Sequence, residues 1–173
     1  MGELVVRTRQ SFDCSASTVW SLLCNSRMDG RSKLLFKLGV PQPVQCRVTD
    51  AHGGVGSERE CVSDQGVVHQ RILEWLPGQR LSFRMERTDM QFQKFVSGIA
   101  DTFEIAPTSS GVVVTRVTTA STLGRFQTFR RISLYIGLKQ VHRYVFQNWR
   151  RLAQHGTLVA NAMDGPVRPG ASS

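Results

Sequence analysis

The chain has 173 residues, of which 40% are hydrophobic and 20% are charged, and its formal net charge is +9. This size and composition fit one domain with a sizeable core and exclude a globally disordered chain. No stretch approaches the roughly 18 uncharged apolar residues of a membrane-spanning helix, and charges interrupt the apolar run at the N-terminus. The sequence therefore predicts neither a span nor a signal peptide, and it favours a cytoplasmic location.

The first part of the chain predicts one strand and two short helices. Residues 3–12 alternate between polar and apolar side chains, as a strand does. Ser15 or Ser17 then offers an N-cap for a helix whose apolar residues recur at helical spacing as far as Leu23. A second short helix is predicted over 33–38. Pro41 and Pro43 stop it, because proline lacks a backbone donor.

The middle of the chain predicts repeated hairpins. Strand-like stretches occupy residues 44–49, 57–62, 67–76, 81–87, 95–106 and 112–120, and short turns rich in glycine, proline and serine separate them. Links this short join neighbouring antiparallel strands.

After residue 124 the hydrophobic period becomes helical. The segment 125–154 carries one apolar stripe, formed by Leu134, Leu138, Val141, Val145, Trp149 and Leu152. Residues 157–173 lack periodicity and are expected to be disordered, which leaves 1–156 as a single domain. Only the last helix is long enough to cover the apolar face of the sheet. We therefore predict an α+β fold with a curved antiparallel sheet of about seven strands, two short helices and one long C-terminal helix.

Three segments resemble the START/polyketide-cyclase superfamily, which shares the helix-grip fold with the birch-pollen-allergen proteins. They are SASTVWSLL at 15–23, the hairpin stretches 56–59 and 72–83, and the helix end at 148–152. The resemblance covers about residues 3–155. It implies a mostly apolar cavity between the sheet and the long helix, in which a few polar groups orient a hydrophobic ligand. Such folds host carriers, cyclases, dehydratases and interaction modules, so the resemblance does not specify an activity.

The hairpins predict which strand residues face this cavity, because residues opposed across a hairpin share a face. The turns suggest the pairings 62/67, 76/81 and 105/112, which place Arg59 opposite Gln70 and Asp101 opposite Arg116. A slip of one residue would reverse the faces of a strand. The inward-facing candidates for ligand contact are Arg59, Glu74, Phe83, Asp101, Phe103 and Arg116.

The four charged candidates admit two interpretations. They form the polar end of a binding or catalytic pocket, where buried charges are paired or shift their pKa values. Alternatively, they form two ordinary cross-strand ion pairs near the wet mouth of the cavity.

The long helix adds three candidates. Leu138 belongs to the apolar stripe, whereas Tyr135 and His142 lie two turns apart on a flanking stripe and could both lean over a ligand. Alternatively, the Tyr135 hydroxyl lies in water and His142 lies on the solvated flank of the helix.

The cysteines and histidines predict no metal, cofactor or catalytic set. Cys14, Cys24, Cys46 and Cys61 lack C-x-x-C spacing, so we expect reduced, partly buried thiols in a cytoplasmic protein. No Ser/His/Asp or Cys/His set can be assembled from spacing, and phosphate-binding glycine motifs are absent.

These observations favour a carrier or sensor that binds a hydrophobic small molecule, such as a lipid, a quinone or a polyketide-like compound. One alternative is an enzyme resembling polyketide cyclases and dehydratases, in which polar cavity groups handle protons. Alanine substitutions would separate the two, because a carrier should lose affinity whereas an enzyme should lose turnover.

A second alternative is a basic interaction protein. Residues 1–104 hold 13 basic and 12 acidic side chains, so the excess positive charge lies in the C-terminal part. The resemblance includes coenzyme-Q-binding relatives beside membranes and a ribosome-associated relative. We rank peripheral contact with an anionic membrane above contact with nucleic acid, because no aromatic-rich RNA-binding motif is visible. A solvated basic face without a partner is the simpler interpretation. The candidate contacts are Arg31, Lys33, Phe36, Lys37, Arg130 and Arg131. The oligomeric state is not predicted.

Overall fold

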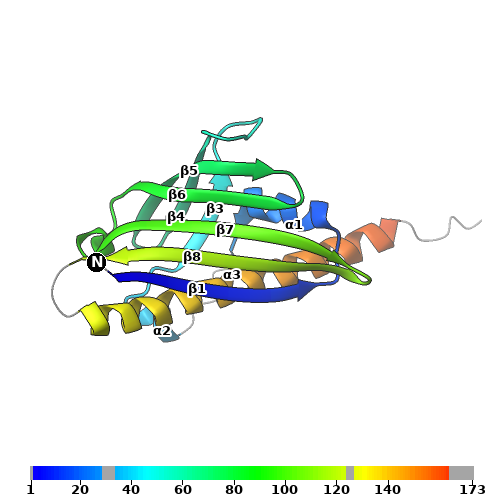
Figure 1. Cartoon of the computed structure of the whole chain (residues 1–173). Coiled ribbons are helices and arrows are strands. Elements are labelled where there is room, and N and C mark those ends of the chain that lie inside the picture. Colours follow the sequence, from blue (N-terminus) through cyan, green and yellow to red (C-terminus); the bar gives the residue numbers. More distant parts are fainter. Residues whose placement is uncertain (1, 29–33, 124–126, 164–173) are drawn as a thin grey trace, which may run out of the picture.

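A computed structural model of the chain describes residues 2–28, 34–123 and 127–163. An eight-stranded antiparallel sheet curls around one long helix, with strand order β1-β8-β7-β6-β5-β4-β3-β2 (Figure 1). The strands are β1 (Gly2–Phe12), β2 (Asn25–Arg27), β3 (Pro43–Val48), β4 (Glu58–Ser63), β5 (Gly66–Leu76), β6 (Arg80–Thr88), β7 (Val96–Thr108) and β8 (Gly111–Thr122). The predicted fold class is confirmed. The eighth strand is β2, which is too short to show a period in the sequence.

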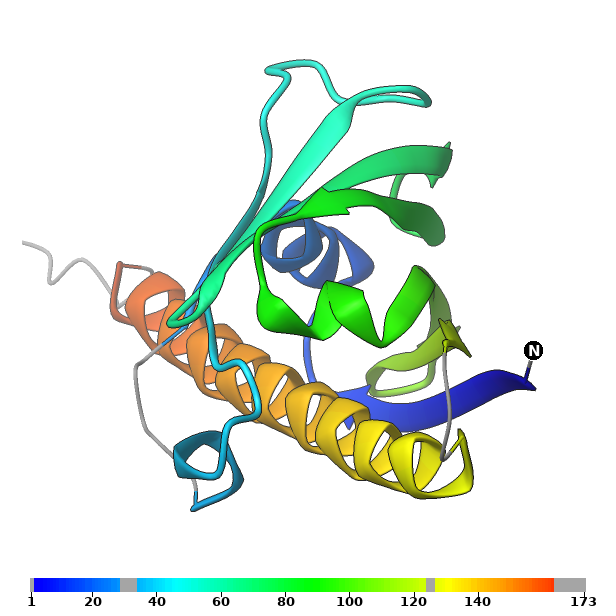
Figure 2. The same cartoon turned by 90° about the vertical axis from the view of Figure 1, so that its left-hand side faces the viewer.

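Within the described residues, three helices and one 3-10 turn accompany the sheet. The first helix, α1 (Ala16–Cys24), begins where the Ser15 hydroxyl accepts a hydrogen bond from the Thr18 amide at 3.2 Å. A single turn, α2 (Leu34–Lys37), and the 3-10 segment η1 (Gln91–Lys94) follow. The long helix α3 (Gln127–Met163) crosses the open side of the curled sheet (Figure 2). Across these described segments, we find no helix long and apolar enough to cross a bilayer.

The long helix continues beyond the residue at which its apolar stripe ends. The sequence pattern predicted its end at Gln154 and a disordered tail over 157–173, whereas the backbone of α3 is helical to Met163. Residues 164–173 lie outside the described part of the chain. The boundary of the domain at residue 156 stays a prediction.

The strand register follows the prediction in one hairpin and differs in two. In β4–β5, Val62 pairs with Val67 and Arg59 pairs with Gln70, as predicted. In β5–β6 the turn is one residue shorter than predicted, so that Leu76 lies opposite Arg80, and a further irregularity between residues 72 and 74 places Ile72 opposite Phe83. In β7–β8 the pairing is shifted by two residues, and Ile105 lies opposite Val114. Because side chains alternate, the shift by one changes the face of a residue whereas the shift by two preserves it.

Aromatic side chains from the sheet and from α3 meet in the core. Phe103 on β7 stacks near Phe83 on β6, with 6.0 Å between ring centroids, and lies 5.7 Å from the Trp149 ring. Phe146 contacts Trp149 and, edge to face, Phe12 on β1, at 5.8 Å in each case. This cluster fixes α3 against the sheet and forms one wall of the internal space.

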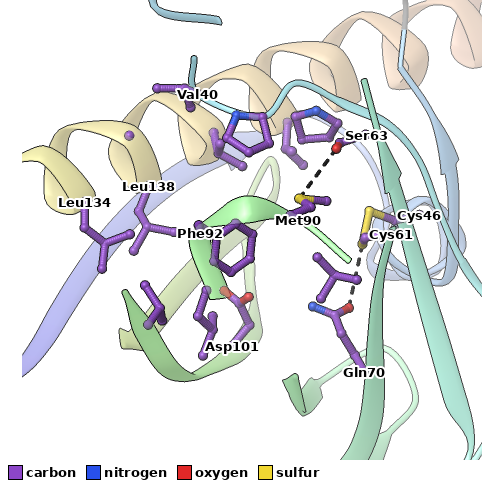
Figure 3. A pocket seen from close by; sticks show the side chains of 18 of the residues that line it. Val40, Cys46, Cys61, Ser63, Gln70, Met90, Phe92, Asp101, Leu134 and Leu138 are labelled. Atoms are coloured by element: carbon purple, nitrogen blue, oxygen red, sulfur yellow. Dashed lines mark hydrogen bonds between the residues drawn. A yellow bond between two sulfur atoms is a disulfide. The ribbon is translucent and has the colours of Figure 1, made fainter. Parts of the chain in front are cut away.

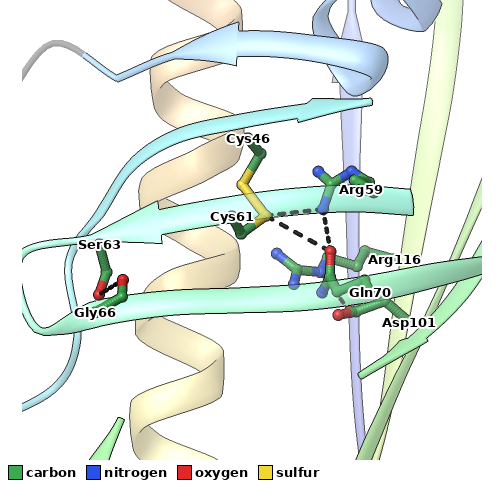
Figure 4. Close-up of a disulfide and its surroundings, with 8 residues drawn as sticks. All are labelled: Cys46, Arg59, Cys61, Ser63, Gly66, Gln70, Asp101 and Arg116. Atoms are coloured by element: carbon green, nitrogen blue, oxygen red, sulfur yellow. Dashed lines mark hydrogen bonds and ion pairs between the residues drawn. A yellow bond between two sulfur atoms is a disulfide. The ribbon is translucent and has the colours of Figure 1, made fainter. Parts of the chain in front are cut away.

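A disulfide joins Cys46 on β3 to Cys61 on β4 (Figure 4), so the expectation of reduced thiols is wrong for this pair. The two residues lie directly opposite one another in the antiparallel ladder, with 4.1 Å between their Cα atoms. The bond depends on strand pairing, so the absent C-x-x-C spacing could not reveal it. Cys14 and Cys24 are free. Since disulfides are rare in reducing compartments, the cysteines no longer support a cytoplasmic location, which stays a prediction.

Candidate functional site: an internal cavity with a charged end

A cavity of about 490 Å³ lies between α3 and the concave face of the sheet (Figure 3). Its volume falls within the range of roughly 300–1,000 Å³ that small-molecule sites occupy. Most of its lining is apolar, and the wall on α3 includes Leu134, Leu138, Val141, Val145 and Trp149. Gly137 lies in the same wall, and its position brings α3 close to Val40. The space can therefore hold an apolar molecule.

The cavity opens to solvent where residues that line it are also exposed, and we call this region its mouth. Phe129, in the first turn of α3, is 73% exposed, and Phe95 after η1 is exposed as well. The Arg130 guanidinium lies over the Phe95 ring, 4.6 Å from its centroid, and donates a hydrogen bond to the Leu123 carbonyl at 2.8 Å. These contacts hold the N-terminal turn of α3 beside the mouth.

Asp101 and Arg116 form a buried ion pair in the wall of the cavity. The Nε of Arg116 lies 2.8 Å from Oδ1 of Asp101, which also accepts a hydrogen bond from the Thr118 hydroxyl. Burial alone would raise the pKa of Asp101, but the positive charge of Arg116 and these hydrogen bonds lower it. Asp101 is therefore a carboxylate at neutral pH.

His142 continues this polar chain away from the cavity. The Thr118 oxygen lies 2.7 Å from His142 Nε2, and Nδ1 lies 3.0 Å from the Thr8 hydroxyl. Thr118 donates its only proton to Asp101, so Nε2 carries the imidazole proton and Nδ1 accepts from Thr8. Burial, assisted by the charge of Arg116, lowers the pKa of His142 to about 2. His142 is a neutral structural group, and it is not poised as an acid or base for a ligand.

The buried environment of His142 predicts that the folded protein loses stability in acid. The unfolded chain protonates His142 near pH 6.5 whereas the folded protein does not, so stability falls as pH drops below that value. The slope approaches about 1.4 kcal/mol per pH unit once the unfolded histidine is protonated, and the expected loss between pH 6.5 and 4.5 is about 2.3 kcal/mol. Urea unfolding at a series of pH values measures it.

Substitution isolates the contribution of His142 to that slope. His142→Gln removes the titrating ring and should flatten the pH dependence over this window. Asp101, Arg116 and Lys139, the charged groups that affect His142, stay in place. His52→Gln, at an exposed loop position, is the matched control and should retain the slope. A slope in His142→Gln equal to that of the unsubstituted chain would contradict the prediction.

Arg59 is the second buried cation of the cavity, with 4% of the residue exposed. Its Nη1 donates to Gln70 Oε1 at 2.5 Å and to the Cys61 sulfur at 2.8 Å (Figure 4). The guanidinium lies 4.4 Å from the centroid of the Phe83 ring. Burial and the nearby Arg116 lower the pKa of Arg59 to about 10, which leaves it protonated at neutral pH.

The structure brings six of the nine candidate ligand contacts to the cavity. The residues that line it are Arg59, Phe83, Asp101, Phe103, Arg116 and Leu138. Their contact with a ligand stays a prediction. Tyr135 is exposed and does not line the cavity, and His142 is buried behind the wall.

The prediction that Glu74 points inward is wrong. The shorter β5–β6 turn pairs Glu74 with Ser82 and so turns it to the outer face, where its Oε2 lies 2.8 Å from Arg80 Nε. Asp101 and Arg116 remain inward, although Asp101 lies opposite Thr118 and their ion pair is diagonal.

The predicted membrane or partner contacts differ in their exposure. Phe36 is buried, 5.0 Å from the Tyr144 ring between centroids, so its assignment to an exposed contact is wrong. Lys37 and Arg131 are exposed, although Arg131 also donates to the Glu3 carbonyl at 3.0 Å. Arg130 lies at the mouth. Arg31 and Lys33 lie outside the described residues.

Sequence reasoning missed three participants in the site. Thr118 joins Asp101 to His142, and alternation along β8 from Arg116 would have placed it on the inner face. Gln70 was placed opposite Arg59 but was not selected as a cavity residue, although it binds the guanidinium. Cys61 contacts the same guanidinium and had no signal in the spacing of the cysteines.

Outside the cavity, one group of three side chains is of the residue types that bind metal ions. Glu58, Glu60 and His69 gather on the outer face of β4 and β5, the only such group among the residues described. His69 Nδ1 lies 2.5 Å from Glu58 Oε1, and Arg47 pairs with Glu60 at 3.2 Å. Arg87 also approaches Glu58, at 3.4 Å. The group is thus satisfied as an ion-pair cluster.

Comparison with known proteins supports the fold. No protein-family model and no curated protein matches the chain. Among solved structures, a START superfamily protein from Mycobacterium smegmatis matches with a TM-score of 0.62 and 9% identity, over 89% of this chain and 99% of that one. Protein NE0264 from Nitrosomonas europaea matches with a TM-score of 0.61 and 20% identity, over 90% and 97%. A Thalictrum norcoclaurine synthase matches with a TM-score of 0.58 and 14% identity, over 90% and 97%. The chain therefore has the helix-grip fold of START-like structures.

Proposed function

We propose that this protein binds a hydrophobic small molecule in its internal cavity and acts as a carrier or sensor. The observation that carries the proposal is the apolar cavity between α3 and the sheet, with its few buried polar groups. Lipids, quinones and polyketide-like compounds are the ligand classes that such a space suits. The polyketide cyclase alternative has less support, because His142 is neutral, buried and bonded to Thr118 and Thr8.

Binding of a neutral apolar dye, Nile red, tests whether the cavity is the binding site. Leu138→Trp places a larger side chain in the α3 wall and should weaken dye binding at least tenfold. Ile136→Trp, on the exposed side of the same helix, is the matched control and should bind as the unsubstituted chain does. Equal binding by all three proteins would contradict an internal site. Native mass spectrometry of protein purified from its own host would then identify a bound ligand by mass.

We also propose that the mouth of the cavity contacts an anionic membrane. The exposed residues Phe129, Ile132 and Ile136 recur at steps of three and four along the start of α3, so they share one face beside the mouth. Arg131 is exposed nearby. An apolar stripe flanked by cations suits the interface of an anionic bilayer, where each near-surface cation contributes about 1 kcal/mol.

Co-sedimentation with vesicles tests this contact. Binding to vesicles rich in phosphatidylserine should exceed binding to phosphatidylcholine vesicles and should fall at high salt. The double substitution Phe129→Ser/Ile132→Ser should reduce binding several-fold, because it removes most of the exposed apolar stripe. Leu73→Ser, an exposed position on the strand β5, controls for the loss of an exposed apolar side chain elsewhere. Absence of binding to anionic vesicles removes this second proposal.

A further inference from the structure

The charges along the cavity do not balance. Among the described residues, the lining includes three arginines, Arg59, Arg116 and Arg130, but a single carboxylate, Asp101. Asp101 is bonded to Arg116, and Arg130 lies at the mouth against the Leu123 carbonyl. Within the described part of the chain, no carboxylate forms an ion pair with Arg59. The inner end of the cavity therefore holds a net positive charge.

Asp101 attracts Arg59 electrostatically but is bonded to Arg116, and no other neighbouring titratable group among the described residues supplies a second negative charge. His142 is neutral, and burial raises the pKa of the Cys24 thiol, which lies near Arg59, to about 11. Cys61 is in the disulfide. The groups that contact the Arg59 guanidinium are neutral: the Gln70 amide oxygen, the Cys61 sulfur and the face of the Phe83 ring. A buried cation without a counter-ion is costly, so this arrangement calls for an anion from outside the chain.

Several residues that line the same cavity carry unused hydrogen-bond donors. Arg59 Nε is buried and has no hydrogen-bond partner. Ser26, Thr122 and Trp149 also line the cavity, and each carries a buried polar atom without a partner. Native proteins leave few such atoms unpaired, and all four can donate a hydrogen bond. A ligand that brings acceptor atoms would satisfy the nearest of these donors.

We propose that the ligand is a hydrophobic acid, that is, an apolar molecule whose carboxylate pairs with Arg59 while its apolar body lies along the α3 wall. This inference rests on the proposed function, because it specifies the head group of the same ligand. A planar guanidinium matches a carboxylate through two parallel hydrogen bonds. Asp101 keeps Arg116 engaged, so Arg59 is the cation that the acid meets.

A series of probes with one chain and three head groups tests the inference. Decanoate, decanol and decylamine compete with Nile red for the cavity of the intact protein. Decanoate should bind about tenfold to a hundredfold tighter than decanol, as expected for hydrogen bonds to a charged group, and decylamine should bind weakest. Arg59→Met should remove the preference for decanoate and leave the affinity for decanol within about threefold.

A control variant and three distinct outcomes separate the possible failures. Arg84→Met, at an exposed arginine on β6, is the matched control and should keep the preference for decanoate. Equal binding of decanoate and decanol to the unsubstituted chain overturns the inference while the proposed function stands, and this comparison needs no folded variant. Retention of the preference in Arg59→Met overturns the assignment to Arg59. Failure of all three probes to displace the dye contradicts the proposed function itself.

Discussion

Asp101→Ala is expected to lower the free energy of unfolding by about 3–5 kcal/mol, measured by urea denaturation at neutral pH. The substitution removes the carboxylate that pairs with Arg116 at 2.8 Å and accepts the Thr118 hydroxyl. Arg116 and Arg59 then share a cavity wall with no counter-ion from the described residues. Leaving a buried charge uncompensated costs more than the intact pair contributes, which is why the expected loss is large.

A double substitution distinguishes this cause from a general loss of packing. Asp101→Ala/Arg116→Met removes both charges, so it should cost less than the sum of the two single substitutions. Glu104→Ala is the matched control on the same strand: Glu104 pairs with Arg80 on the outer face, where both side chains are about half exposed, and its loss should cost at most about 1 kcal/mol. Additive losses in the double variant would show that the ion pair is not the cause.

Much of the fold could be predicted from hydrophobic period and turn chemistry. Alternation over 3–12 and 112–120 follows from a sheet with one buried face, and it anticipated β1 and β8. The stripe from Leu134 to Leu152 anticipated the covering helix. The strand β2 has three residues, and no period can be recognised over so short a length.

The inward face of a strand was predictable where the hairpin register was kept, as in β4–β5, or shifted by two residues, as in β7–β8. The short β4–β5 turn kept its register, so Arg59 was placed correctly. The β5–β6 turn pairs Leu76 with Arg80 instead of Leu81, and this shift of one residue reversed the face of Glu74, because it exchanges the two faces of a strand. His142 carries a polar side chain on the flank of the apolar stripe, which is typical of solvated positions. Its burial depends on Thr8 and Thr118, residues more than twenty positions away in the sequence, so tertiary pairing alone identifies it.

Trp149→Ala is expected to lower the free energy of unfolding by about 3–5 kcal/mol, because it removes a fully buried ring between the sheet and α3. The ring contacts Phe103 and Phe146, with centroids 5.7 and 5.8 Å away, and it lines the cavity. The lost side chain would also enlarge the cavity beside the aromatic cluster. The midpoint of urea unfolding, with the slope checked for change, measures the effect.

Trp149→Phe distinguishes the contribution of the buried ring to stability from the contribution of its N–H group. The Nε1 of Trp149 is buried without a partner, so replacing the indole by a phenyl ring breaks no hydrogen bond and should cost less than half as much as alanine. A loss in Trp149→Phe as large as that in Trp149→Ala would mean that the N–H group is bonded in the folded protein. A small loss in stability, combined with weaker binding of decanoate, would instead place this donor on the ligand. The pair of substitutions thus distinguishes a packing role of Trp149 from a role in binding the head group of the ligand.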